Sequence, residues 1–143
     1  MNQSLTMQAH KNKTLASLLA FLLGGLGLHR FYLYGKSDKW AWLHLASLPA
    51  SGLVVSAFPD LPLFFGLMPL ILSVLIAFLE TLVIGLTPDE KWDAKHNPAS
   101  GHTSQSAWPL AVLLVLTVGV GATGLIAVIA RSFDLLFTGG AFG

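Results

Sequence analysis

The sequence predicts an all-α integral membrane protein with four transmembrane helices. Of its 143 residues, 54% are hydrophobic and only 10% are charged. A soluble domain carries roughly 25% charged residues. The charges are concentrated between four apolar runs, and a helix needs about 20 apolar residues to cross the hydrocarbon of a bilayer. The runs cover residues 14–28, 40–58, 61–86 and 107–130.

Length alone does not identify the first two runs as transmembrane spans. Run 14–28 is short, but Lys11 and Lys13 precede it, and lysine side chains can reach along a helix to the head groups. The same lysines resemble the start of a signal peptide, yet we expect an uncleaved span because a charged turn follows directly. Run 40–58 contains Pro49, and we favour a kinked span there over a re-entrant loop.

The polar loop after the third run predicts a short interfacial helix. Thr87 fits the N-cap, Pro88 the first helical position, and Glu90 a position three residues after the cap. The chain then divides into four parts. These are a polar N-terminal tail at 1–13, a hairpin with the third span at 14–86, a polar loop at 87–106, and the fourth span with a C-terminal tail at 107–143.

The segment between the first two runs carries a resemblance to a known family. Its motifs are Lys11-x-Lys13-x-x-Ala16, Gly24-Gly25-Leu26-Gly27 and His29-Arg30-Phe31-Tyr32. Over about residues 11–86 the chain resembles the TM-two domain family, which is named for two transmembrane helices. Tyr34 intervenes before Gly35, a departure from the family pattern, and Glu80 would correspond to an acidic residue near the end of the domain. The resemblance implies architecture and no chemistry, because the family's bacterial members have no agreed activity.

Tryptophan and basic residues predict the orientation. If the spans alternate in direction, all four tryptophans fall on one side, at the membrane boundary that indole rings prefer. They are Trp40, Trp42, Trp92 and Trp108. That side would carry five lysines and arginines against three on the other. Because cytoplasmic flanks retain positive charge, we expect loops 29–39 and 87–106 in the cytoplasm and both termini outside, in a bacterial inner membrane.

Glu80 is the one carboxylate well inside an apolar run, and it is the first candidate for a functional residue. An ionised side chain at the centre of a membrane helix costs roughly 2.5–3.5 kcal/mol on insertion scales, so it should find a partner. Helical rise places Glu80 about 9 Å and His44 about 6 Å from the same boundary. His29 and Arg30 lie at that boundary too. We therefore expect an intramembrane polar cluster of these four residues, with Glu80 paired to Arg30 or His44.

Two function classes follow from this pattern. A structural or regulatory membrane module without enzymatic activity is the expectation, and a small proton or cation channel or transporter using Glu80 and His44 is the alternative. The sequence has no cysteine, no metal-ligand spacing such as H-E-x-x-H, and no serine, histidine and carboxylate set at one depth. We expect no cofactor and no bound metal.

Glycines form two small-residue surfaces, which suit close helix packing in lipid. The first consists of Gly24, Gly25 and Gly27, and the second of Gly119, Gly121 and Gly124. The second also matches the G-x-G-x-x-G nucleotide fingerprint, but by accident, because its amides must stay bonded inside the bilayer. Whether it meets this chain or another copy stays open. The net charge of +1 argues against nucleic acid, so the bilayer and a second protomer are the expected partners.

Overall fold

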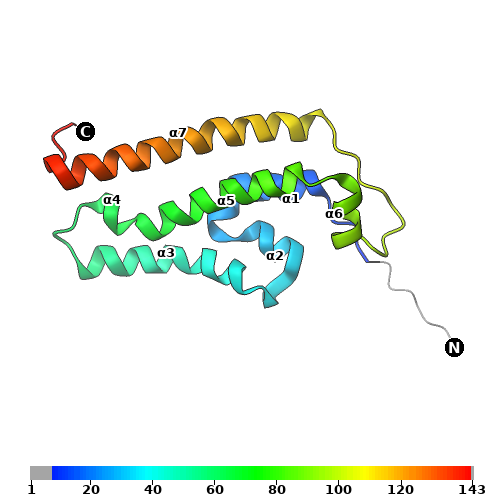
Figure 1. Cartoon of the computed structure of the whole chain (residues 1–143). Helices are drawn as coiled ribbons and strands as arrows, with labels where there is room; N and C mark the ends of the chain where they lie inside the picture. Colours follow the sequence, from blue (N-terminus) through cyan, green and yellow to red (C-terminus); the bar gives the residue numbers. More distant parts are fainter. Residues whose placement is uncertain (1–7, 143) are drawn as a thin grey trace.

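The computed structural model describes residues 8–142, and all regular elements in that part of the chain are helical. Figure 1 shows them as a bundle of roughly parallel and antiparallel helices. In chain order they are α1 (Lys13–Leu23), the 3₁₀ turn η1 (Gly24–Leu26), α2 (Leu28–Tyr34), the 3₁₀ turn η2 (Gly35–Ser37), α3 (Lys39–Ala57), α4 (Leu63–Gly66), α5 (Met68–Leu86), α6 (Asp89–His96) and α7 (Trp108–Thr138). The predicted helical class is confirmed. Residues 1–7 of the predicted N-terminal tail lie outside the described part.

Helix α1 is too short to cross a membrane, contrary to the prediction for run 14–28. Its eleven residues rise about 16 Å, against about 30 Å of hydrocarbon. The glycine run then reverses the chain at Gly27, whose φ of 75° is in the left-handed region that glycine adopts without steric cost. The run was predicted to be a single span because hydropathy alone does not reveal a reversal of the chain.

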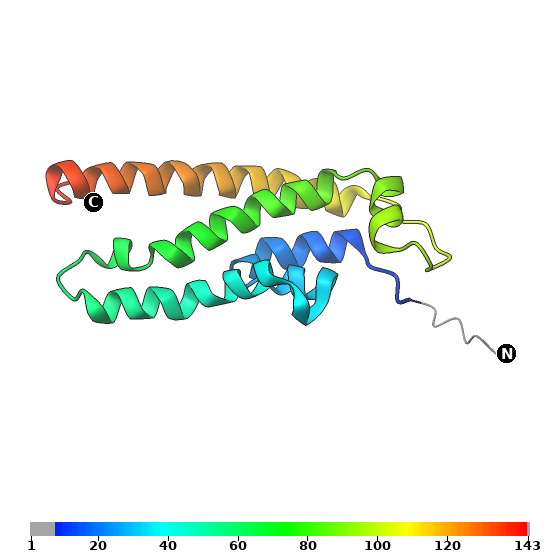
Figure 2. The ribbon, with the colours of Figure 1, turned by 60° about the horizontal axis from the view of Figure 1, so that its bottom comes forward.

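Helix α2 leads the chain back to the level at which α1 began. There the ammonium of Lys11 donates to the carbonyl of Tyr32 at 2.7 Å, and the backbone N–H of Asn12 donates to the Tyr32 hydroxyl at 2.9 Å. Residues 13–34 therefore form a short hairpin with both ends on one side (Figures 1 and 2). Most of the predicted turn at 29–35 is helical.

Helices α5 and α7 are long and apolar enough to cross a membrane, with 19 and 31 residues. Helix α3 also has 19 residues and runs beside α5 in both views (Figures 1 and 2), but it contains Pro49 and several polar side chains. The third predicted span, 61–86, is divided between α4 and α5. Two of the four predicted spans thus correspond to candidate membrane helices, and four transmembrane helices are not confirmed.

Small residues fill the interface between the short hairpin and α5, while large apolar residues face outward. Ala16, Ala20 and Ala77 are fully or almost fully buried, whereas Leu22 is 63% exposed and Val83 69% exposed. This is the inverse of a soluble core. It is expected in lipid, where close backbone packing rather than the hydrophobic effect brings helices together.

The N-terminal segment lies against the loop that follows α5. Its backbone at Lys11 donates to the side-chain oxygen of Asn97 at 2.6 Å and accepts from the indole N–H of Trp92 at 2.9 Å. The ammonium of Lys13 pairs with Asp89. The prediction placed this tail on the side opposite loop 87–106, and it is wrong because the chain reverses at Gly27 and these contacts hold the tail against the loop.

Helix α6 lies within the loop where a short helix was predicted, but it begins one residue later than the predicted cap implied. The hydroxyl of Thr87 donates to the carbonyl of Val83 at 2.6 Å, so Thr87 caps the end of α5 and not the start of α6. Pro88 occupies the N-cap position of α6, and Asp89 and Glu90 lie in the first turn, where the helix dipole favours negative charge.

Candidate functional site

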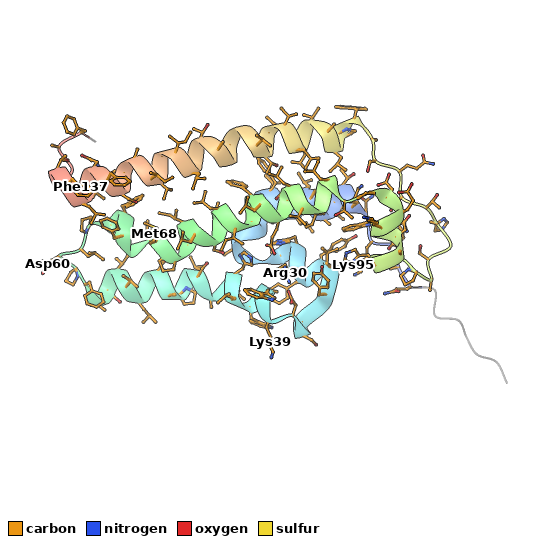
Figure 3. All side chains as sticks on the ribbon, viewed as in Figure 1. Arg30, Lys39, Asp60, Met68, Lys95 and Phe137 are labelled. Atoms are coloured by element: carbon orange, nitrogen blue, oxygen red, sulfur yellow. The ribbon has the colours of Figure 1, made fainter. Side chains whose placement is uncertain are left out.

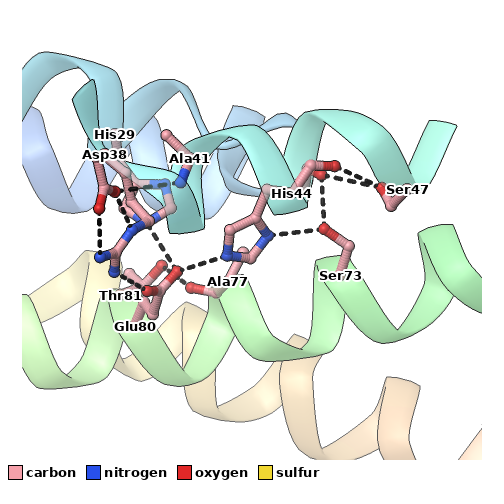
Figure 4. Close-up of polar contacts among 11 residues, drawn as sticks. His29, Asp38, Ala41, His44, Ser47, Ser73, Ala77, Glu80 and Thr81 are labelled. Carbon is pink, nitrogen blue, oxygen red and sulfur yellow. Dashed lines mark hydrogen bonds and ion pairs between the residues drawn. The ribbon is translucent and has the colours of Figure 1, made fainter. Parts of the chain in front are cut away.

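The carboxylate of Glu80 on α5 is surrounded by nitrogen atoms from two other helices (Figure 4). Its Oε1 atom lies 2.5 Å from Nη1 of Arg30, and its Oε2 atom lies 2.8 Å from Nε2 of His29 and 3.0 Å from Nε2 of His44. His29 and Arg30 come from α2, and His44 comes from α3. The structure therefore brings together all four residues of the expected intramembrane cluster.

The fold supplies these side chains through the short hairpin and the start of α3. Because the chain reverses at Gly27, the first turn of α2 faces α5, and His29 is 1% exposed there. A Cβ atom on Gly27 would come within 2.6 Å of the Ala41 carbonyl, so only glycine allows α3 to approach this closely. His44 lies one turn beyond that contact, level with Glu80.

Asp38 is a member of the cluster that the sequence reasoning missed. Its carboxylate accepts from Nε of Arg30 at 2.6 Å and also from the backbone N–H of Ala41 at 3.1 Å, which caps α3. The hydrogen bond from Arg30 holds the pKa of Asp38 below its usual value. The available signal was an aspartate immediately before an apolar helical run, which is a typical N-cap pattern.

Ser73 on α5 determines where the protons of His44 lie. Its hydroxyl has one hydrogen, which it donates to the carbonyl of Gly25 at 2.7 Å, and it also lies 2.7 Å from Nδ1 of His44. Nδ1 must therefore be the donor in the second contact. The contact between Nε2 of His44 and Oε2 of Glu80 then needs a further proton, because two acceptors cannot hydrogen-bond to each other.

The charges of the cluster then sum to zero. Arg30 and the proton shared by His44 and Glu80 balance the carboxylates of Asp38 and Glu80 when His29 is neutral. The Nδ1 atom of His29 is buried and has no hydrogen-bond partner among the described residues, so a proton there would leave a buried donor unpaired. A neutral cluster is what a low-dielectric environment favours.

The TM2 domain family matches residues 9–76, which include the short hairpin, α3 and the first half of α5. A relative from Bacillus subtilis (strain 168), the "Uncharacterized membrane protein YozV", is 63% identical over 93 residues, which make up 64% of this chain and 87% of that protein. The chain belongs to the TM2 domain family. No solved structure matches it. Together with the two long apolar helices, the relative identifies a membrane protein.

The TM2 domain match contains every member of the cluster except Glu80. The match ends four residues before this carboxylate, whereas the resemblance was expected to extend to about residue 86. The donors His29, Arg30 and His44 thus lie inside the TM2 domain, and their common acceptor lies just beyond it on the same helix as Ser73.

The two glycine surfaces differ in how closely other atoms approach them. A Cβ atom on Gly24 would come within 2.6 Å of the Cβ atom of Ala77, and one on Gly25 within 2.6 Å of Val74, so the short hairpin of this TM2 domain needs glycine against α5. On α7, a Cβ atom on Gly121 would make only ordinary contact, and one on Gly119 would meet nothing within 4 Å. The nearest neighbour of a Cβ atom on Gly124 is Leu75 at 3.8 Å.

A second polar network holds the loop beside the start of the TM2 domain. Asp93 accepts from the side-chain amide of Asn97 at 2.8 Å and from the hydroxyl of Ser104 at 2.6 Å. These bonds lower the pKa of Asp93 to about 2, and the bond from Asn97 has the largest effect.

Trp92, which we expected at the membrane boundary, is 2% exposed, and the centroid of its ring lies 4.3 Å from that of His96. Burial lowers the pKa of His96.

Proposed function

We propose that this protein is a non-enzymatic structural or regulatory membrane module, in which the Glu80 cluster locks the short hairpin against α3 and α5. The observation that carries this proposal is the saturation of the Glu80 carboxylate. Both of its oxygen atoms accept hydrogen bonds, and the donors come from two different helices. Because an unpaired charge at this depth is costly, these contacts favour one arrangement of the three helices.

A small proton or cation channel using Glu80 and His44 is the second candidate. It is favoured by the line of polar groups that runs from Glu80 through His44 to Ser73. That line ends at the carbonyl of Gly25, which can accept a hydrogen bond but has no proton to pass on. The end of the line supports the structural role over conduction.

Flux measurements in proteoliposomes test the two candidates against each other. We expect vesicles with the wild-type protein to hold a pH gradient or a potassium gradient as long as protein-free vesicles do, and vesicles with Glu80→Gln to behave in the same way. An added ionophore would establish that each gradient is measurable. Flux that requires Glu80 would overturn the structural proposal and establish the channel.

We further propose that α3, α5 and α7 cross the cell membrane, and that the short hairpin enters it and returns. Seven of the eight lysines and arginines then lie on the α6 side, and Arg131, near the far end of α7, is the exception. In Figure 3, Asp60 and Phe137 lie at the left end of the molecule and Lys95 lies toward the right, with Lys39 between them at the lower edge. This asymmetry supports a cytoplasmic location for the α6 side, with the N-terminal segment there and the C-terminus outside.

A further inference from the structure

A groove of about 480 Å³ lies between α3 and α5, on the outer surface of the helix bundle. Its apolar wall consists of Trp40, Leu43, Ala46 and Ala50 on α3, with Leu72 and Ile76 on α5. Its polar lining consists of Arg30, His44 and Glu80 from the cluster, with Ser47 and Ser73. Leu43 is 60% exposed, and Leu72 and Ile76 are 49% and 50% exposed. The groove therefore opens away from the protein, toward the surface that would face lipid.

The polar side chains in the groove leave few groups free to bind a ligand. Both ring nitrogens of His44 are occupied, by Ser73 and Glu80, and the hydroxyl of Ser73 donates to the Gly25 carbonyl. Arg30 is taken by the carboxylates of Asp38 and Glu80. Because these groups are already satisfied, an occupant gains most from apolar contact, and its polar part should lie outside the groove.

The dimensions of the groove fit a chain from one leaflet. From Trp40 to Ala50 the helical rise is about 15 Å, and half of a hydrocarbon core of about 30 Å is also about 15 Å. The groove begins at Trp40, whose ring is 62% exposed at the α6 end of α3, where the head groups of that leaflet would lie. It runs parallel to the helices, which is the direction of an acyl chain.

The mouth of the groove is basic. Lys39 directly precedes Trp40, and Lys36 lies in η2 three residues earlier, where its carbonyl accepts from the indole N–H of Trp42. Both lysines are exposed, and neither makes an ion pair among the residues that the structure describes. The nearest carboxylate along the chain, Asp38, is already held by Arg30. A phosphate at this level would therefore meet two free ammonium groups, and each juxtamembrane lysine contributes about 1 kcal/mol toward anionic lipid, or about fivefold in affinity.

We infer that the groove binds one acyl chain of an anionic phospholipid from the leaflet on the α6 side, with its phosphate at Lys36 and Lys39. This inference rests on the proposed crossing of α3. The bound lipid covers the lipid-facing edge of the Glu80 cluster and fills the space between α3 and α5. The head group determines which lipid is bound, and the depth of the groove in the membrane determines which leaflet supplies this lipid.

Quenching of Trp40 by brominated lipids tests the inference. The full-length protein is reconstituted in phosphatidylcholine vesicles that contain either phosphatidylglycerol or phosphatidylcholine brominated near the ester end of one acyl chain. The signal of Trp40 is the difference between wild type and Trp40→Phe. We expect half-maximal quenching of this signal at a fraction of brominated phosphatidylglycerol at least about fivefold lower than that of brominated phosphatidylcholine.

Three variants assign the effect to the groove. The double variant Lys36→Gln and Lys39→Gln should bring the ratio close to one without changing the groove. Replacing Ala46 and Ala50 by leucine should fill the groove and reduce quenching by phosphatidylglycerol to the level of phosphatidylcholine. Ala127→Leu, on an exposed face of α7, is the matched control and should leave the ratio unchanged.

Each of the other possible outcomes would overturn one specific step of the proposal. Equal quenching by the two lipids in the wild type would overturn the choice of an anionic head group, and a preference that survives the leucine variants would overturn the groove as its place. A groove covered by a second copy of the chain would give no lipid preference and a change of oligomeric state in the leucine variants. Quenching of Trp40 by aqueous iodide, and by neither lipid, would overturn the proposed crossing of α3 itself.

Discussion

Removing the Glu80 carboxylate should destabilise the protein more than removing its charge alone. Glu80→Ala leaves the nitrogen atoms of His29, Arg30 and His44 without their common acceptor. Stranding one side of a buried pair costs about 3–5 kcal/mol, and we expect about 3 kcal/mol because the Glu80 side chain remains 22% exposed. Glu80→Gln should cost about 1–2 kcal/mol, because its oxygen can still accept from Arg30 and its amide can donate to a neutral His44.

Double-mutant cycles measure whether the cluster acts as a unit. The free energy of unfolding in mixed detergent micelles is determined for Glu80→Ala, Arg30→Ala and His44→Ala, alone and in pairs. Residues in one hydrogen-bond network commonly show coupling of about 0.5–3 kcal/mol, and we expect the Glu80 and Arg30 cycle to lie in that range.

A distant pair is the control for these cycles. Arg131 pairs with Asp134 at the far end of α7, so Glu80→Ala and Arg131→Ala should be additive within about 0.5 kcal/mol. Additivity of Glu80→Ala with both Arg30→Ala and His44→Ala, at the level of this control, would refute the role of the cluster as the lock between the helices.

Three further predictions concern orientation, packing and pH. The sequence has no cysteine, so single cysteines can be introduced without background labelling. An impermeant thiol reagent added outside intact cells should label Asp60→Cys but not Lys95→Cys. The reverse result would invert the proposed orientation. Gly24→Ala should lower the thermal midpoint in detergent by several degrees, because the added Cβ atom meets Ala77. Gly119→Ala should raise the midpoint slightly, because its Cβ atom meets nothing within 4 Å and alanine favours the helix by roughly 1 kcal/mol. Equal effects of the two variants would contradict the close packing of the short hairpin. Burial lowers the pKa of His96, so its neutral form should stabilise the protein above pH 6.5, and this contribution should be lost as pH falls through the lower pKa of the folded state. The unfolding free energy of the wild type minus that of His96→Gln should therefore decrease as pH falls over this range. A difference that does not change with pH would contradict this prediction.

The sequence by itself determined the class of protein and the location of its most costly charge. Helical membrane structure follows from composition, because a chain with so few charged residues cannot cover a soluble surface and long apolar runs satisfy their backbone only as helices in lipid. Glu80 could be singled out because an ionised group in such a run must acquire partners. His44 was predicted as a partner from helical rise, since depth along a helix is a local quantity. Arg30 was predicted as the other possible partner from its place at the membrane boundary, where His29 was expected as a further member of the cluster.

Only the tertiary structure decided which apolar runs form long helices and which run reverses. Run 14–28 has the hydropathy of a span, but Gly24 and Gly27 allow a reversal whose irregular backbone is tolerated because α3 and α5 bury it, and sequence periodicity does not report that burial. The reversal moved the N-terminal segment to the α6 side. It also explains why Ser73 and Asp38 went unrecognised. Their roles depend on which faces of α2, α3 and α5 meet, and that is determined by packing between segments far apart in the chain.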